Sequence, residues 1–151
     1  MGKLEHFRVR VVESKTVDTI IVKSSKIREL IQMGNVGRAG QLLGHYFCSR
    51  GLVTRGKGRG EQLGFPTANL KLAKALHPGV GVYAVWVTLE GCRFPGAMNV
   101  GFNPTFQGQQ LSPEVHILGF APRPLYDQEV EICFVERIRN EFRTTLSSGF
   151  R

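Results

Sequence analysis

Apolar and polar residues alternate with a period of two through much of the second half of the chain, as expected for strands that bury one face. Residues 81–89 read Gly-Val-Tyr-Ala-Val-Trp-Val-Thr-Leu and are rich in β-branched and aromatic side chains. The spacing predicts a strand with Val82, Ala84 and Trp86 on one face and Tyr83 among the residues of the other. We expect both Tyr83 and Trp86 to lie in the apolar core.

Similar patterns after this segment predict further strands. Glu90-Gly91 is a hairpin-turn pair and leads to a partner strand from Phe94 to Val100. A short strand is expected from Val115 to Phe120, and the alternation of acidic and apolar residues from Glu129 to Glu136 is typical of a half-buried strand. Short strands at regular spacing, separated by Gly and Pro, favour a closed antiparallel barrel.

The N-terminal part has a different pattern, with helix signals. Residues 7–12 alternate well enough to predict a short strand. Residues 24–31 have apolar side chains at helical spacing and predict a capped helix that ends at Gly34. A second short helix is expected from Val36 to Leu43, closed by Gly44. This part has too little apolar surface to fold by itself.

Composition and charge fit one globular domain of 151 residues, of which 42% are hydrophobic. The net charge is +8, and residues 1–60 hold the whole excess, with twelve Lys or Arg against four Asp or Glu. Such a basic segment suits a nucleotide, a nucleic acid or an acidic partner, and a solvated surface is the structural alternative.

The cysteines and the N-terminus bear on location. Cys48, Cys92 and Cys133 form no Cys-x-x-Cys pair, so neither a zinc site nor a redox dithiol is indicated. An odd number without a disulfide framework is typical of a reducing compartment, and we expect a cytoplasmic protein. There is no signal-peptide hydrophobic region, and no apolar stretch approaches the roughly eighteen residues of a transmembrane helix.

The run Leu63-Gly-Phe-Pro-Thr-Ala-Asn69 is the strongest chemical signal in the chain. Thr67 and Asn69 are two residues apart, so on an extended backbone a hydroxyl and an amide oxygen share one face. Beside them lies the glycine- and cation-rich segment 56–60, whose backbone N–H groups would cradle phosphate. Neutral oxygens beside a basic loop suit a hard cation that carries a polyphosphate.

A P-loop is rejected, because residues 51–58 lack its final Ser or Thr and lead to no helix. Glu114 stands just before an apolar run and is a candidate general base, with surface charge as the alternative. His116 would face the same side as Glu114, and we expect it to be a core histidine.

Two further segments are candidates for the walls of a site. Residues 99–106 contain a Pro-Thr pair and are expected to form a shaped loop that lines a pocket. Arg137, Arg139 and Arg143 are expected to form either a phosphate patch or a solvated face.

Taken together, these segments resemble the riboflavin kinase domain. They follow its order and spacing from about Tyr46 to Glu141, and Gly-Phe-Pro-Thr-Ala-Asn is the most specific of them. The matching segments are Gly56–Gly60, Leu63–Asn69, Gly81–Val85, Asn99–Gly101 with Pro104–Phe106, Glu114–Leu118, Leu125–Tyr126 and Phe134–Arg139.

The resemblance implies a mainly β fold, a six-stranded antiparallel Greek-key barrel behind a short helical segment. It implies ATP-dependent phosphorylation of riboflavin at the 5′-hydroxyl to give FMN, by positioning and charge neutralisation. Thr67 and Asn69 would bind Mg²⁺ and the terminal phosphates, and Glu114 would accept the hydroxyl proton. The residues that it assigns to the ATP site besides these are Gly56, Lys57, Gly58, Arg59, Gly60, Gly64 and Pro66.

Residues 22–44 resemble the end of the adenylyltransferase module of the bacterial bifunctional enzyme that makes FMN and FAD. The resemblance implies residues 1–45 as a remnant of that module with a linker, and 46–151 as a barrel without the family's C-terminal helix. Asp127 stands where the family usually has glycine. No FMN adenylyltransferase activity is expected, because the rest of that nucleotide pocket is not encoded here.

The expected partners are riboflavin, FMN, ATP and ADP, with no nucleic acid and no membrane. Two alternatives remain open. The chain is a truncated, inactive piece of the bifunctional enzyme, or it is a basic β-barrel that binds nucleic acid. The second would need exposed aromatic residues between cations on one strand face.

Overall fold

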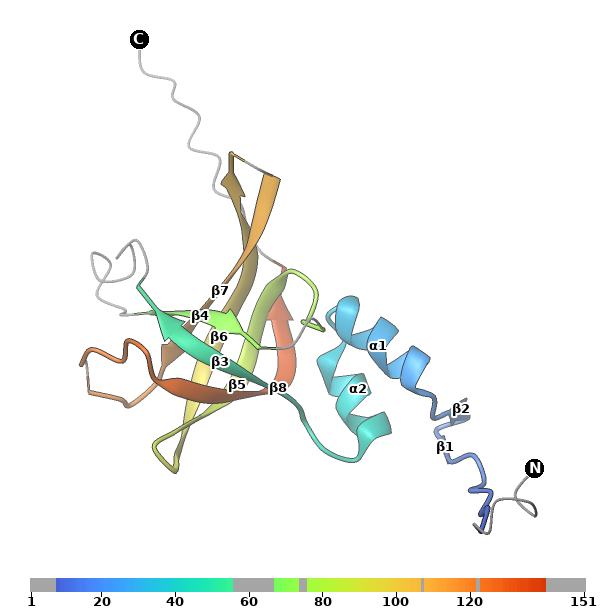
Figure 1. The fold of residues 1–151 in the computed structure, drawn as a ribbon. Coiled ribbons are helices and arrows are strands. Elements are labelled where there is room, and N and C mark those ends of the chain that lie inside the picture. The colour runs from blue at the N-terminus through green and yellow to red at the C-terminus, as the bar shows by residue number, and fades with distance from the viewer. Residues whose placement is uncertain (1–7, 56–66, 74–75, 107, 122, 141–151) are drawn as a thin grey trace.

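The computed structural model describes residues 8–55, 67–73, 76–106, 108–121 and 123–140. Its main body is a closed barrel of antiparallel strands, with two short helices packed beside it (Figure 1). The predicted six-stranded antiparallel barrel is therefore confirmed. None of the helices in these described ranges is long and apolar enough to cross a membrane.

The barrel strands follow one another around the wall in the order β3-β4-β7-β6-β5-β8, and β8 pairs with β3 to close it. Every neighbouring pair is antiparallel. The strands are β3 (Phe47–Thr54), β4 (Ala68–Leu72), β5 (Gly81–Leu89), β6 (Cys92–Thr105), β7 (Gly108–Ile117) and β8 (Glu129–Arg139).

Strand β5 shows why the barrel closes around one core. Its residues alternate between fully and partly buried from Gly81 to Leu89, the range that the pattern predicted. Tyr83, Val85 and Val87 are at most 3% exposed and point into the barrel. The turn at Glu90 and Gly91 has φ values of 51° and 78°, the two left-handed residues of a tight hairpin, which confirms the predicted turn.

Trp86 lies on the other face of β5, and its predicted place in the core is wrong. The guanidinium of Arg93 lies 4.7 Å from the centre of the Trp86 ring, over its face. Both faces of β5 are apolar in sequence, so alternation alone could not tell which face the barrel encloses. Trp86 is partly buried, and this arginine covers one face of its ring.

Helices α1 (Ser24–Gln32) and α2 (Val36–Leu43) confirm the predicted pair. The Asn35 side chain accepts a hydrogen bond from the backbone N–H of Arg38 at 3.2 Å, and Gly44 closes α2 in the left-handed conformation. The expected serine cap of α1 is wrong: Ser24 is already helical, and Lys23 precedes it without a side-chain cap.

The helices share one apolar core with the barrel. Ile31, Val36 and Ala39 are at most 1% exposed and belong to the same cluster as the inward residues of the strands. Figure 1 shows both helices at one side of the barrel, and α2 contacts β8 and β3. This packing supplies the apolar partner that the N-terminal part lacks in isolation.

The strand expected at residues 7–12 is wrong for its described part. Residues 8–15 have no regular structure, and Val9, Val11 and Val12 are 66–86% exposed. Only the two-residue strands β1 (Thr16–Val17) and β2 (Ile20–Ile21) pair in this region. An alternating run needs a neighbouring strand for its hydrogen bonds, and none reaches residues 8–12 among those described.

Strands β6 and β7 are longer than expected and form one hairpin. Residues 99–105, predicted as a loop, continue β6 and pair with β7 as far as Thr105 with Gly108. Strand β7 ends at Ile117, so the strand predicted to run to Phe120 starts earlier and stops sooner. Pro104 is tolerated at a place where it faces Gln109 across the far end of the hairpin.

Two cysteines pair across the wall of the barrel. Cys48 on β3 faces Cys133 on β8, with their Cα atoms 4.0 Å apart, and the two sulfurs form a disulfide. The expectation of cysteines without a disulfide is therefore wrong: the two residues are 85 apart in sequence, so their spacing gave no sign of the pairing. Cys92 is an exposed free thiol.

Asp127 has a positive φ of 63° in the turn before β8. Glycine adopts this left-handed conformation without strain, and Asp is among the other residues that tolerate it. The backbone therefore accounts for the glycine of the family pattern at this position, and for its replacement by Asp.

Candidate functional site on the outer face of the barrel

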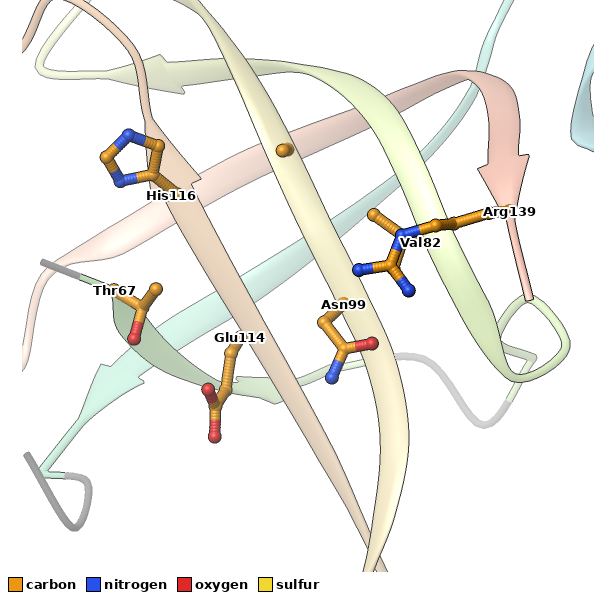
Figure 2. A pocket seen from close by; sticks show the side chains of 7 residues that line it. Thr67, Val82, Asn99, Glu114, His116 and Arg139 are labelled. Carbon is orange, nitrogen blue, oxygen red and sulfur yellow. The ribbon is translucent and has the colours of Figure 1, made fainter. Parts of the chain in front are cut away.

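A pocket of about 330 Å³ opens on the outer face of the barrel wall, across strands β5 to β8 and the residue that precedes β4. Figure 2 shows its side chains on neighbouring strands. This volume is at the low end of small-molecule sites, enough for part of a substrate. The lining residues are Thr67, Val82, Ala97, Asn99, Glu114, His116 and Arg139.

Strand register brings the polar residues together in one row across the wall. Glu114 on β7 faces Asn69 on β4 on one side and Asn99 on β6 on the other. Asn99 in turn faces Val82 on β5, which faces Arg139 on β8. Residues directly opposite each other on neighbouring strands have Cβ atoms about 4.5–5.5 Å apart, so their side chains can act on one ligand.

The alternation of each strand turns this row outward. Val115, which follows Glu114, is 1% exposed in the core, and Met98, which precedes Asn99, is fully buried. Leu70, which follows Asn69, is 4% exposed. Because neighbours along a strand point to opposite faces, the three polar residues lie on the outside of the barrel.

Asn99 carries an unusual atom for a pocket wall. Its Oδ1 is buried and accepts no hydrogen bond. Two other buried side-chain atoms in the described part of the chain also have no partner, Gln128 Oε1 and Arg137 Nε, but neither residue lines the pocket. Buried polar atoms are almost always paired in folded proteins, so an orphan in a pocket points to a ligand.

Only some of the predicted site residues lie in or next to the pocket. Thr67 and Glu114 both line the pocket, and Asn69 is the register partner of Glu114 although it is not one of the lining residues. The segment 51–54 of the rejected P-loop is part of strand β3. The remaining predicted residues lie outside the described residues; they are Gly56, Lys57, Gly58, Arg59, Gly60, Gly64 and Pro66.

Three polar lining residues were not assigned to the site from sequence. His116, expected in the core, lines the pocket instead, because Val115 and Ile117 are the inward residues of β7. Its spacing of two from Glu114 was the available signal. Asn99 was expected in a loop near a pocket, and Arg139 belonged to an unresolved choice between a phosphate patch and a solvated face.

The arginines near the C-terminus that the structure describes do not form one patch, because Arg139 and Arg137 point to different places. Arg139 reaches from β8 toward Asn99, on the side away from Glu114 (Figure 2). Arg137 points to the helices, where its guanidinium donates to the carbonyl oxygens of Val80 and Met33. Arg143 lies outside the described residues. The pocket therefore has a cation at one end of the row and a carboxylate near the other.

The donor set suits a hard cation that also binds phosphate. Within the described ranges, no group of three His, Cys, Asp or Glu residues is placed to hold a metal by itself. Thr67, Asn69 and Glu114 offer hydroxyl, amide and carboxylate oxygens, the ligand types that Mg²⁺ takes. Mg²⁺ usually takes one or two protein ligands and completes its shell with phosphate and water, so these residues fit it.

The fold is a closed antiparallel barrel, with an oxygen-rich pocket on the outside of its wall. The family model described as "Flavokinase: Riboflavin kinase" matches residues 43–147, which span all the barrel strands. The chain belongs to the riboflavin kinase family.

Curated relatives agree with this family. The chain is 38% identical over 139 residues to a bifunctional riboflavin kinase/FMN adenylyltransferase of Listeria monocytogenes, covering 91% of this chain and 44% of that protein. It is also 38% identical over 123 residues to the Escherichia coli K12 protein of the same name, covering 81% and 39%. The chain thus spans less than half the length of these relatives.

A solved structure shares the fold. It comes from Streptococcus pneumoniae, is described as a macrolide-efflux protein, and superposes with a TM-score of 0.83 at 36% identity. The match covers 89% of this chain and 44% of that one.

Proposed function

We propose that this chain transfers the γ-phosphoryl group of ATP to the 5′-hydroxyl of riboflavin and releases FMN and ADP. The observation that carries the proposal is the row of Asn69, Glu114 and Asn99 on neighbouring strands, in a chain of the riboflavin kinase family. Glu114 and Asn99 of this row line one pocket together with Thr67. The row unites a carboxylate with neutral oxygen donors, as phosphoryl transfer from a metal-bound nucleotide requires.

Glu114 is proposed as the general base. Its carboxylate accepts the proton of the 5′-hydroxyl while that oxygen bonds to the γ-phosphorus and the bond between this phosphorus and the β,γ-bridging oxygen breaks. ADP leaves with the bridging oxygen, and the proton remains on Glu114 until it passes to solvent. The pocket wall contributes mainly position, because phosphoryl transfer needs alignment more than covalent help from the protein.

Thr67 and Asn69 are proposed to hold Mg²⁺ together with the terminal phosphates. When bound, Mg²⁺ would neutralise charge on the phosphate oxygens. Thr67 immediately precedes β4 and Asn69 is its second residue, and Leu70 anchors that strand in the core at 4% exposure. The glycine-rich residues 56–60, with Gly64 and Pro66, are proposed to cover the phosphates with backbone N–H groups.

The wider role follows from the reaction. FMN is a flavin cofactor and the substrate for adenylylation to FAD, so we place the reaction in the biosynthesis of both. We propose a cytoplasmic location, because a kinase draws on the intracellular ATP pool; the Cys48–Cys133 disulfide is an argument against a reducing compartment. Residues 1–45 are proposed as the end of an adenylyltransferase module, and residues 46–151 as the kinase-like unit. No adenylyltransferase activity is proposed for this chain.

Incubation of the purified chain with riboflavin, ATP and Mg²⁺, followed by chromatographic separation of flavins, tests the proposal. We expect FMN to accumulate in step with ADP, and no FAD from added FMN. Glu114→Gln is the matched control for contaminating kinase, because it should abolish most of the signal. Absence of FMN from a folded chain would refute the proposal and favour the inactive-fragment alternative.

A further inference from the structure

Asn99 has a feature that the proposed chemistry does not use. Its Oδ1 is buried and has no hydrogen-bond partner, and the residue lines the pocket and stands directly opposite Glu114 across strands β6 and β7. The backbone of β6 holds it there, between Met98 and Val100, which are both fully buried. Figure 2 shows the Asn99 side chain between Glu114 and Arg139, with its oxygen on the Arg139 side. An acceptor held there is suited to bind a group that lies next to the one at Glu114.

The chemistry of the atom narrows what it binds. An amide oxygen accepts a hydrogen bond and donates none, so phosphate oxygens, which are also acceptors, do not satisfy it. A hydroxyl group does. The substrate of the proposed reaction is a polyol at this end, and the hydroxyl that reacts has a second one on the neighbouring carbon.

We propose that Asn99 is a positioning residue that accepts a hydrogen bond from the C4′ hydroxyl of riboflavin, next to the 5′-hydroxyl at Glu114. This inference rests on the proposed function. Asn99 and Glu114, on neighbouring strands, then accept hydrogen bonds from the two hydroxyls of a terminal 1,2-diol. Binding of the first hydroxyl by Asn99 limits rotation of the last carbon–carbon bond and holds the second hydroxyl at Glu114.

With Asn99 in this role, the pocket discriminates between a flavin that has the C4′ hydroxyl and one that lacks it. A buried acceptor that loses its donor is left desolvated, so an analogue without the C4′ hydroxyl is penalised by more than the lost contact. The alternative role for the same oxygen is as a ligand of Mg²⁺. If Asn99 has that role, its substitution should change the Mg²⁺ dependence of the reaction and leave the preference for riboflavin over the analogue unchanged.

The test compares riboflavin with its 4′-deoxy analogue in the parent chain and in Asn99→Leu, which has a similar shape without polar atoms. The parent should prefer riboflavin by about 10–100-fold in kcat/KM. In Asn99→Leu this preference should fall to within about threefold, mainly because riboflavin becomes a poorer substrate. Flavin fluorescence titration in the presence of Mg-ADP gives the same comparison for binding alone.

Gln128→Leu is the matched control, since Gln128 holds another buried, unpartnered amide oxygen but lies outside the pocket. It should retain the full preference for riboflavin, and thermal unfolding of each variant reports its folding. An Asn99→Leu protein that folds and discriminates as the parent does would overturn the inference. A raised Mg²⁺ requirement with unchanged discrimination would overturn it too, in favour of the metal-ligand role.

The two proposals fail in different ways. A parent chain that phosphorylates both flavins equally well refutes the role of Asn99 and leaves the kinase proposal intact. A folded parent chain that neither binds nor phosphorylates riboflavin refutes the kinase proposal, and the inference about Asn99 falls with it.

Discussion

Arg137 on β8 stands directly opposite Tyr83 on β5, and the two side chains donate hydrogen bonds to carbonyl oxygens of the same short backbone segment, residues 79–80. The Tyr83 hydroxyl donates to the carbonyl oxygen of Gly79, and the Arg137 guanidinium donates to that of Val80. Gly79 in turn donates its N–H to the carbonyl oxygen of Ile31 in helix α1, at 3.1 Å. This pair therefore ties the helices to the barrel wall.

Space around the pair is restricted. A Cβ atom added at Gly34 would lie 2.7 Å from the Tyr83 hydroxyl oxygen and 3.1 Å from an Arg137 nitrogen. Gly34 also has a φ of +83°, a conformation that favours glycine, and a side chain there would have to displace the Tyr83 hydroxyl or the Arg137 guanidinium. An irregularity in pairing between Ala84 and Val85 shifts the register of β8 and brings Arg137 opposite Tyr83.

Tyr83→Phe should destabilise the fold. The substitution leaves the Gly79 carbonyl without its side-chain donor in a partly buried place, and we expect a loss of about 1–2 kcal/mol in the free energy of unfolding. Urea denaturation measures this loss. Tyr46→Phe is the control because Tyr46 is 42% exposed, and it should change the same quantity by less than about 0.5 kcal/mol. Equal effects of the two variants would contradict the role of the Tyr83 hydroxyl.

Because of Tyr83, the free energy of unfolding should depend on pH in the alkaline range. Burial raises the pKa of Tyr83 above its ordinary value of 10.0, and the nearby Arg137 charge acts in the lowering direction. Above pH 10.0 the unfolded chain loses this proton first, so the free energy of unfolding falls as pH rises toward the folded pKa. Tyr83→Phe lacks this loss, and the stability gap between parent and variant should narrow above pH 10.0. A gap that stays constant from pH 8 to 11, roughly the working range, would contradict the prediction.

The Cys48–Cys133 bond should stabilise the barrel. It closes a loop of 85 residues in sequence separation, and bonds that close long loops typically contribute about 2–4 kcal/mol by restricting the unfolded chain. Addition of dithiothreitol should lower the denaturation midpoint of the parent. The Cys48→Ser/Cys133→Ser double variant should show the lower midpoint without reductant and no further response to it. A response of that double variant would trace the effect to something other than this bond.

Local patterns predicted the elements well, because alternation along β5 and the helix signals around Val36–Leu43 involve only residues near in sequence. Residues that face each other on neighbouring strands of the barrel were harder to predict. Cys48 with Cys133, and Asn99 with Glu114, depend on which strands are neighbours and in what register. The short-range pattern holds no information on either.

The face of a residue was predictable where one side of its strand is polar. Glu114 and His116 were expected on a common side, and both line the pocket. The place of His116 in the core was wrong because that common side faces outward. Trp86 was misplaced for a related reason: β5 is apolar on both sides, and the guanidinium of Arg93 that covers the Trp86 ring comes from strand β6.

Thr67→Ala and Asn69→Ala should each weaken binding of Mg-ADP. Thr67 precedes β4 and lines the pocket, and Asn69 on β4 faces Glu114. Loss of one proposed oxygen ligand should cost about 1–3 kcal/mol, or roughly 5–150-fold in Kd. Isothermal titration with and without Mg²⁺ separates the metal-dependent part. Thr88→Ala, on β5 and outside the pocket, serves as the matched control. Titrations unchanged in both variants would overturn the assignment of the metal and phosphate ligands.

Glu114→Gln should remove catalysis and keep binding. Gln has nearly the same shape as Glu, so its place opposite Asn69 and Asn99 in the strand register persists, but the amide does not accept the proton of the 5′-hydroxyl. We expect kcat to fall by about 10²–10⁴-fold while the Kd for Mg-ADP changes by less than about threefold. Single-turnover formation of FMN, followed beside nucleotide titration, measures the two quantities separately. Glu131→Gln on β8, outside the pocket, controls for the loss of one carboxylate. A Glu114→Gln protein that turns over as fast as the parent would leave Glu114 as a surface charge, whereas loss of nucleotide binding along with kcat would assign it to the metal and phosphates.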